Sequence, residues 1–233
     1  KEADIEEVKD DLKDIEFEDK RDFESIDAFS GTITKSGLEK LKDNPNVESI
    51  QVDHTFSIGL VDSVPLIDAD KMHAKKIINN INGKNIGVCV LDTGVDYNHA
   101  ELINNYLGGY DFVNNDDDPM DDHGHGTHVF GIVKGVAPGS GIIGMKVMNS
   151  AGSGSESDII AGIDWCIGNK TNYNITTITM SIGAGLFTDY CDSSFPSLAG
   201  AINNAIANNI NVVASAGNDG SETSISSPGC IEN

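Results

Sequence analysis

The sequence contains a single arginine, Arg21, and far fewer basic than acidic residues. Lys and Arg together number 15 and Asp and Glu 37, which gives a formal net charge of -22. A protein this acidic repels phosphate groups, so we expect neither nucleic acid nor an anionic membrane surface among its partners. The sequence also has no run of about 18 apolar residues, which argues against a membrane-spanning helix. It begins without methionine and without an apolar signal segment, and we expect its natural start to be missing or removed.

Cysteine is scarce, and none of the four residues has the C-x-x-C spacing of a structural zinc site. Cys89 and Cys166 lie inside apolar runs, where we expect buried thiols. Cys191 and Cys230 lie in loop-like segments rich in Ser and Pro. A disulfide between these two is possible and would indicate an oxidising compartment.

Glycine is sparse in residues 1–60, where Lys, Asp and Glu are dense. The pattern there predicts a strand that begins at Phe29, a short helix capped by Ser36 and a second strand over residues 47–52. Such a small α+β unit is marginally stable by itself. The residues that follow, 55–72, have the character of a linker.

From about residue 85 onward, continuous apolar runs alternate with patterns of helical spacing. The alternation indicates the α/β class, with a parallel sheet that carries helices on both faces. In such sheets the functional groups lie beyond the carboxyl ends of the strands. The strands are expected at 85–92, 144–149, 175–182 and 210–217, and helices at 155–169, 194–209 and after residue 125.

Asp92 ends the first of these apolar strands. A carboxylate in this position loses water, so it needs a partner. A turn-capping role before Gly94 is one interpretation, and a phosphoryl-accepting or magnesium-binding Asp at a strand end is another. The local sequence leaves both open beside a catalytic role.

Histidines cluster in the segment DDHGHGTH, residues 121–128. His125 lies between two glycines and precedes a helix, so another part of the chain can approach its ring closely. Together with the neighbouring Asp residues, His123, His125 and His128 also resemble a transition-metal cluster. The spacing alone does not choose between acid–base and metal-binding chemistry, and for His128 we favour a buried structural role.

Asn218 follows the last predicted strand, in a segment that also reads as an ordinary Asn-Asp-Gly turn. Its amide could instead face a cleft. Taken together, an Asp, a His and an Asn amide at the ends of one parallel sheet fit acyl transfer.

Four segments resemble successive motifs of the subtilisin-like serine proteases, in the family's order and with similar gaps. They are VCVLDTGVDYNHAEL, HGHGTHVFGIVKGVAP, ITMSIGAG and NVVASAGNDG. The resemblance implies a subtilisin-like catalytic domain over residues 61–233. Residues 1–60 are similar to the family's propeptide, a small ferredoxin-like α+β domain that acts as chaperone and inhibitor. The resemblance places the processing site near Leu60–Val61.

The resemblance implies a role for each of three polar residues in an Asp-His-Ser triad mechanism. Asp92 would orient the imidazole, and His125 would act as general base and then as general acid, since an imidazole titrates near neutral pH. Asn218 would donate a hydrogen bond to the developing oxyanion, an interaction worth about 3–4 kcal/mol of barrier.

The resemblance also implies two walls of a substrate cleft. An edge strand that pairs with the substrate backbone would be formed by Ser181, Ile182 and Gly183. The pocket for the residue before the scissile bond would be lined by Ser215, Ala216 and Gly217. The opposite wall would contain Gly152, Gly154 and Glu156, and the acidic side chain would favour basic or polar groups farther along the substrate.

Two features depart from the family pattern. No Ser lies in the Gly-Thr-Ser context of the nucleophile, so we expect these residues alone to be inactive and to be a fragment of a longer protease. Phe130 replaces a small residue, which either crowds the start of the helix or fills space left elsewhere.

The family also implies a structural calcium ion, and Asp111 and Asp116 match ligand positions on an acidic loop that could equally be a solvated turn. It further implies polypeptide substrates, inhibition by the chain's own propeptide, and a secreted or cell-surface location. Two other functions stay open: a non-catalytic binding protein on a protease scaffold, and a metal-dependent hydrolase.

Overall fold

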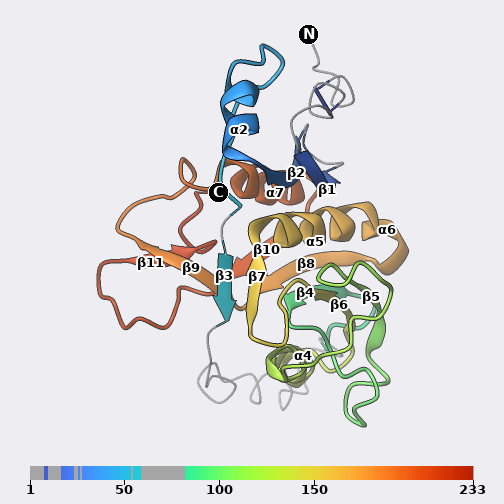
Figure 1. Cartoon of the computed structure of the whole chain (residues 1–233). Coiled ribbons are helices and arrows are strands. Elements are labelled where there is room, and N and C mark those ends of the chain that lie inside the picture. The colour runs from blue at the N-terminus through green and yellow to red at the C-terminus, as the bar shows by residue number, and fades with distance from the viewer. Residues whose placement is uncertain are drawn as a thin grey trace. The chain divides into compact units, whose positions relative to one another are not determined.

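The computed structural model describes residues 8–9, 17–23, 26, 28–53, 55–58 and 82–232 (Figure 1). The chain divides into two compact units, Lys1–His54 and Thr55–Asn233. The expected domain boundary at residue 60 and the expected processing site at Leu60–Val61 lie outside the described residues and stay predictions.

The first unit is built on a pair of antiparallel strands, β1 (Phe17–Phe23) and β2 (Ala28–Ile33), followed by the helix α2 (Lys35–Lys42). Its small core joins Val8 and Leu41 to partly buried apolar neighbours. The unit is α+β, as predicted, but the sequence pattern did not reveal β1.

Two details of the first unit differ from the prediction. The cap of α2 is Thr34, whose hydroxyl accepts a hydrogen bond from the Gly37 amide at 3.2 Å, and not Ser36. The strand predicted over residues 47–52 is wrong: these residues form no strand, and Val52 is 72% exposed. An extended segment becomes a strand only when a partner accepts its backbone hydrogen bonds, and none does here among the described residues.

The second unit contains a five-stranded, all-parallel sheet in the order β10-β8-β4-β6-β5. This confirms the predicted α/β class. Strand β5 was absent from the prediction, since Gly108 and Gly109 interrupt its apolar run. The strands are β4 (Gly87–Asp92), β5 (Tyr106–Asp111), β6 (Gly141–Lys146), β8 (Ile175–Met180) and β10 (Asn211–Ala214).

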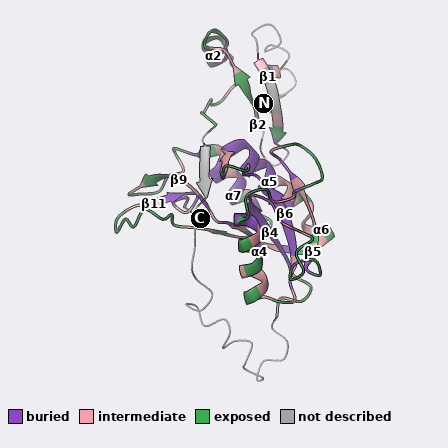
Figure 2. Cartoon of the chain, turned by 60° about the horizontal axis from the view of Figure 1, so that its bottom comes forward, coloured by how far each residue is buried: buried purple, intermediate pink, exposed green. Residues whose placement is uncertain are grey.

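Helices cover both faces of this sheet, with α4 on one face and α5 and α7 on the other (Figure 1). Alternate side chains of β4 show the two layers. Val88 and Val90 pack into a cluster with residues of α4, whereas Cys89 is bonded to Cys166 of α5. The strands and the helix faces against them therefore form the buried interior (Figure 2). The helices are α4 (His125–Val136), α5 (Glu156–Gly168), α6 (Lys170–Tyr173) and α7 (Pro196–Ala207).

Helix α5 begins as predicted, with the Ser155 hydroxyl accepting a hydrogen bond from the Asp158 amide. In α7, Leu198 and Ile202 are buried, whereas Ile206 is 39% exposed and does not belong to the buried face. None of the helices in the described part of the chain has the length and hydropathy needed to cross a bilayer.

Phe130 fills space and does not crowd its helix. Its ring is 1% exposed, and it packs into the cluster between α4 and the sheet. The room comes from Gly144 of β6, where a Cβ atom would lie 3.2 Å from the Phe130 ring. A large residue on the helix and a glycine on the strand therefore keep the layer at native density.

A second, four-stranded sheet has the order β11-β9-β3-β7, and its pairs are antiparallel. Strand β3 comes from the segment that the sequence pattern assigned to a linker. The strands are β3 (Thr55–Ile58), β7 (Ser153–Ser155), β9 (Ile182–Phe187) and β11 (Ile225–Ser227).

All four cysteines form disulfides, Cys89–Cys166 and Cys191–Cys230. The second pair was left possible by the sequence, but the prediction of buried thiols at Cys89 and Cys166 is wrong. Cys89 is buried, as the apolar run predicts. It lies on the face of β4 that meets α5, however, and there its sulfur is bonded to that of Cys166.

We predict that the chain, unfolded without reductant, adds no iodoacetamide, and that after reduction it adds four equivalents. Removing Cys89–Cys166, which closes 77 residues, by Cys89→Ala/Cys166→Ala should lower the free energy of unfolding by about 2–5 kcal/mol. The free energy of unfolding of the Cys191→Ala/Cys230→Ala variant, which lacks the other disulfide, is the matched comparison. Two reactive thiols in the unreduced wild type would contradict the assignment.

Candidate active site

Asp92 and His125 meet at the carboxyl end of the parallel sheet. Side chains alternate along a strand, so Asp92 points to the same face as Val88 and Val90, toward α4. His125 is the first residue of α4. Its Nδ1 atom lies 2.7 Å from Oδ1 of Asp92, and both side chains are buried.

The hydrogen bond decides which ring nitrogen carries the proton. An ionised carboxylate only accepts, so Nδ1 of His125 donates to Asp92. In this tautomer the other nitrogen, Nε2, carries no proton and can accept one. An imidazole in this tautomer has the form of a general base.

The turn after Asp92 is tied to the loop before His125. The Thr93 hydroxyl donates to Oδ1 of Asp121 at 2.8 Å and accepts from the Gly126 amide at 2.9 Å. The Thr93 amide donates to Oδ1 of Asp92 at 2.7 Å. A single residue therefore contacts the carboxylate, the loop and the first turn of the helix.

Asp121 organises the loop itself. Its carboxylate accepts hydrogen bonds from the amides of His123, Gly124 and Thr127 and from the Thr127 hydroxyl. Burial alone would raise the pKa of Asp121, but these hydrogen bonds outweigh burial and hold the pKa below its ordinary value.

Small residues bring the two segments into direct contact. A Cβ atom at Gly126 would lie 2.1 Å from the carbonyl oxygen of Gly94, so only glycine permits this approach. Gly94 itself has φ +107°, a conformation that other residues rarely adopt. Of the two glycines beside His125, Gly126 thus allows a close approach, whereas open space surrounds Gly124.

Strand β3 is an extended segment that fills the space between β7 and β9 in the second sheet, and we call that space the groove. Strand β3 pairs antiparallel with β7, with Phe56 opposite Gly154, and with β9, with Ser57 opposite Gly183 and Ile58 opposite Ile182. Both edges are thus complementary to a peptide backbone in the extended conformation.

Glycine is required in one wall of this groove. A Cβ atom at Gly154 would lie 2.2 Å from the carbonyl oxygen of Val147. Gly152, at φ 70°, makes the turn before β7, and Glu156 follows β7 with only 1% of its surface exposed.

Two backbone segments face each other beside β9. The Ser215 hydroxyl donates to the Ile182 carbonyl at 2.9 Å, and the Ser226 amide donates to the Ala216 carbonyl at 2.9 Å. At Gly217 a Cβ atom would lie 2.4 Å from the Ser226 hydroxyl oxygen, and at Gly229 it would lie 2.6 Å from the Ser215 carbonyl. Residues 215–217 and 226–229 are therefore in direct contact, and the role of the first segment in lining a substrate pocket stays a prediction.

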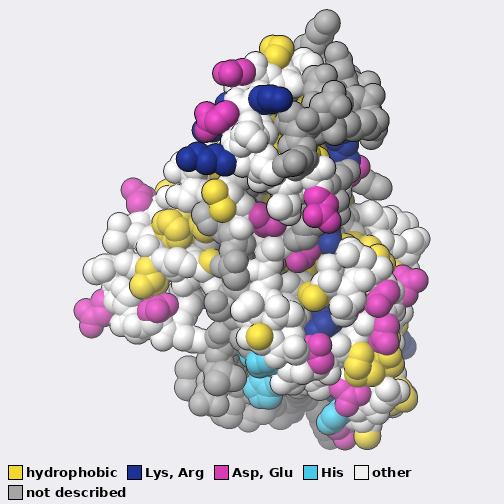
Figure 3. All heavy atoms as spheres, viewed as in Figure 1, with side chains coloured by type: hydrophobic (Ala, Val, Ile, Leu, Met, Phe, Trp, Pro, Cys, Tyr) yellow, Lys and Arg dark blue, Asp and Glu magenta, His cyan; other side chains and the backbone are white. Residues whose placement is uncertain are grey.

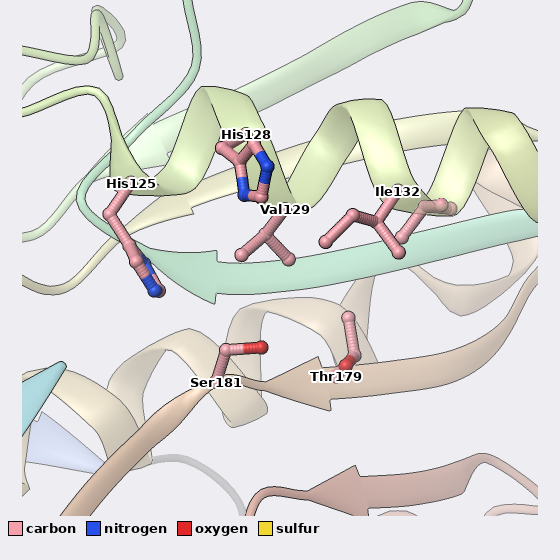
Figure 4. A pocket seen from close by; sticks show the side chains of 7 residues that line it. His125, His128, Val129, Ile132, Thr179 and Ser181 are labelled. Atoms are coloured by element: carbon pink, nitrogen blue, oxygen red, sulfur yellow. The ribbon is translucent and has the colours of Figure 1, made fainter. Parts of the chain in front are cut away.

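A cavity of about 130 Å³ opens between α4 and the end of β8 (Figure 4). His125 and Ser181 lie at one end of it, so it adjoins the Asp92–His125 pair. His128 also lines this cavity and is exposed, which corrects its expected role as a buried structural residue. The cavity is lined by His125, His128, Val129, Ile132, Val133, Thr179 and Ser181.

Asn218 lies on the exposed segment that follows β10, at the same edge of the parallel sheet as Asp92 and Ser181. Its side chain makes no hydrogen bond to another described residue, and its expected role toward an oxyanion stays a prediction.

Asp111 and Asp116 belong to a tight turn after β5. Asp111 is buried, and its two carboxylate oxygens accept hydrogen bonds from the amides of Val113 and Asn114 and from the Asn114 side chain. The Asp116 side chain is exposed and accepts from the Asp118 amide. These three hydrogen bonds leave one lone-pair site on Oδ2 of Asp111 that a cation could use, so the calcium site stays a prediction. The described residues contain no group of three or more His, Cys, Asp or Glu side chains placed to hold a metal ion.

Comparison with known proteins identifies the family. A model of the subtilase family matches residues 83–233. This chain belongs to the subtilase family. Serine protease AprX of Bacillus subtilis is 34% identical over 90% of the chain, and subtilisin E of the same organism is 33% identical over 90%. The crystal structure of a cold adapted subtilisin-like serine proteinase matches with TM-score 0.54 and 32% identity, over 66% of this chain and 54% of that one.

The chain spans about half the length of these subtilases, 50% of AprX and 54% of subtilisin E. The match to each covers more of the chain than the family model does, so it includes residues ahead of residue 83.

Several site residues, or their roles, were missed by the sequence analysis. Thr93 gave no signal beyond its closeness to Asp92 along the chain, and Asp121 was considered only as a possible metal ligand. Ser226 and Gly229 lie in a segment without any motif that the pattern could single out. Strand β3 was hidden because pairing on both edges, and not its own pattern, makes it a strand.

We predict that Asp121→Asn lowers the free energy of unfolding by about 1–3 kcal/mol at pH 7, because several hydrogen bonds to a charged carboxylate are weakened. The folded pKa is lowered, so this stabilisation is present above the unfolded value of about 3.9 and is lost as the pH falls through the folded value. Urea unfolding at pH 7 and pH 3 tests this. Asp117→Asn, the same charge change on an exposed side chain, is the control. An Asp121→Asn effect that is equal at both pH values would contradict the prediction.

Proposed function

We propose that this chain is part of the precursor of a serine endopeptidase. It supplies Asp92 and His125 of an Asp-His-Ser triad, and the nucleophilic Ser lies in a part of the protein outside these 233 residues. The observation that carries the proposal is the buried 2.7 Å hydrogen bond between Asp92 and Nδ1 of His125, next to a groove that binds an extended backbone.

The chemistry follows from the tautomer. Nε2 of His125 takes the proton of the attacking Ser hydroxyl, and the resulting imidazolium is stabilised by Asp92. The same nitrogen then gives the proton to the leaving amine. Asn218 is proposed to donate to the oxyanion that forms on the scissile carbonyl.

The groove accounts for the choice of a polypeptide as substrate. Ser181, Ile182 and Gly183 form the edge strand on one side, and Gly152 and Gly154 form the other wall. A substrate would add a strand between them through backbone hydrogen bonds, which require an extended peptide and not a particular side chain. The side chain before the scissile bond would enter a pocket lined by Ser215, Ala216 and Gly217.

Residues 1–60 are proposed to be a propeptide that inhibits the protease. Strand β3, from this region, occupies the groove in the manner of a bound substrate. The match to subtilisin E ahead of residue 83 also supports this role.

The acidic surface and the two disulfides suit a secreted protein. Disulfides persist in oxidising compartments, and this chain has two with no free cysteine among the described residues. Acidic side chains are spread over the face drawn in Figure 3. The calcium ion implied by the family would be structural, with Asp111 and Asp116 as the residues proposed to hold it, and it enters no step of the reaction.

We predict that the complete protein, expressed with the region that follows Asn233, reacts with a fluorophosphonate probe and hydrolyses peptides. Asp92→Asn should lower kcat about 10⁴-fold, because the imidazole then loses its preferred tautomer. His125→Ala should abolish probe labelling, and Asp117→Asn should change neither. An Asp92→Asn variant that hydrolyses peptides at close to the wild-type rate would refute the serine-protease mechanism. So would a wild-type activity that a zinc chelator stops while the fluorophosphonate probe does not react.

A further inference from the structure

Lys146 ends strand β6, and its side chain is only 1% exposed. A lysine is almost never buried to this degree without partners. Its ammonium donates three hydrogen bonds, to the Thr93 carbonyl at 2.7 Å, to the Met148 carbonyl at 3.1 Å and to Oδ1 of Asp122 at 2.5 Å. All three donor positions of the ammonium are thus filled.

These partners belong to the segments that carry the Asp92–His125 pair. Thr93 directly follows Asp92, and Asp122 lies in the loop that leads to His125. Lys146 is also in register with Asp92 on the neighbouring parallel strand, so the two side chains leave the sheet on the same face. The ammonium therefore joins the turn after one residue of the pair to the loop before the other.

The electrostatics point in the same direction. Asp92 is fully buried, and both hydrogen bonds to its carboxylate fall on Oδ1. Its Oδ2 atom has no hydrogen-bond partner within the described part of the chain. A buried carboxylate with one unsatisfied oxygen is costly, so its hydrogen bond to His125 depends on the segments that hold the pair together.

Lys146 does not merely close a surface ion pair. Its ion-pair partner Asp122 is half exposed. The two carbonyls that the Lys146 ammonium contacts are buried and belong to Thr93, directly after β4, and to Met148, shortly after β6. The chain offers a contrast in Lys134, whose ammonium lies 2.6 Å from Glu101 at the surface. Such exposed pairs contribute little.

We propose that Lys146 is a positioning residue for the reaction, with Asp122 as its anchor. The buried ammonium fixes the turn after Asp92 against the loop before His125, and so sets the length and direction of the hydrogen bond between them. The proposal rests on the serine-protease function, but its geometric part does not require activity.

The test uses Lys146→Met, Lys146→Arg, Asp122→Ala and the control Lys134→Met. The first readout is the ¹H NMR resonance of the His125 Nδ1 proton in the 233-residue chain, which a hydrogen bond to a carboxylate moves to low field. The second is kcat and KM of the complete protease on one peptide substrate.

We expect Lys146→Met to shift or broaden the low-field resonance and to lower kcat about 10–100-fold with KM within about 3-fold, because small displacements of catalytic groups are costly. Lys146→Arg should restore part of the loss, and Asp122→Ala should move both readouts in the same direction by less. Lys134→Met should match the wild type.

A folded Lys146→Met protein that keeps the resonance and has kcat within about 2-fold of Lys134→Met would overturn the proposal. If Lys146→Met does not fold, Asp122→Ala decides: an unchanged resonance and unchanged kcat overturn the proposal, and a shifted resonance with lower kcat supports it. A complete wild-type protein without peptidase activity would refute the proposed function instead, and the resonance in the 233-residue chain would then decide the role of Lys146.

Discussion

A hydrogen bond between two buried side chains, Asp92 and His125, is the interaction on which the rest of the structure depends. A carboxylate is costly to bury, so the fold surrounds it with groups that donate to it or hold its partner in place. Thr93 and Asp121 carry out this function through hydrogen bonds. The glycines at 94 and 126 allow the two segments to touch, because no Cβ atom stands between them. Local chain geometry and acid–base chemistry are thus parts of one arrangement.

The proposed function also requires a surface that binds a peptide without regard to its sequence. The groove between β7 and β9 meets it with two strand edges, whose backbone groups pair with a third strand. In the structure this third strand is β3, from the chain itself. Under the proposed function, a groove filled by the chain itself would stay closed to substrate until that segment leaves. The fold of the parallel sheet places that groove beside the carboxyl ends of β4 and β8, where Asp92 and Ser181 lie.

Much of the fold could be predicted from the sequence because its signals are local. The apolar run before Asp92 predicted a buried parallel strand, and the helical spacing of apolar residues over 155–169 predicted α5. Strands whose identity depends on a distant partner could not be found in this way, as β3 and β7 show. The segment around Val52 shows the opposite case, an apolar pattern without a partner. The disulfide at Cys89 was missed for the same reason, because the approach of α5 decides it.

The candidate site shows a similar division. Asp92 and His125 could be identified from the sequence, because Asp92 ends an apolar strand and His125 lies between two glycines. The resemblance to subtilases then predicted that both belong to one catalytic triad. Lys146 carries no such mark, since a lysine at the end of an apolar strand normally points to solvent. Only the packing of the turn after Asp92 over its ammonium shows that it is buried.

The central claim is that His125 carries its proton on Nδ1, donated to Asp92, and leaves Nε2 as the proton acceptor. Long-range ¹H–¹⁵N correlation NMR of the ¹⁵N-histidine-labelled chain at neutral pH measures this tautomer directly. The account predicts a protonated Nδ1 and an unprotonated Nε2 for His125, with the preference lost in Asp92→Asn. A His125 ring protonated on Nε2, or a tautomer that Asp92→Asn leaves unchanged, would contradict it.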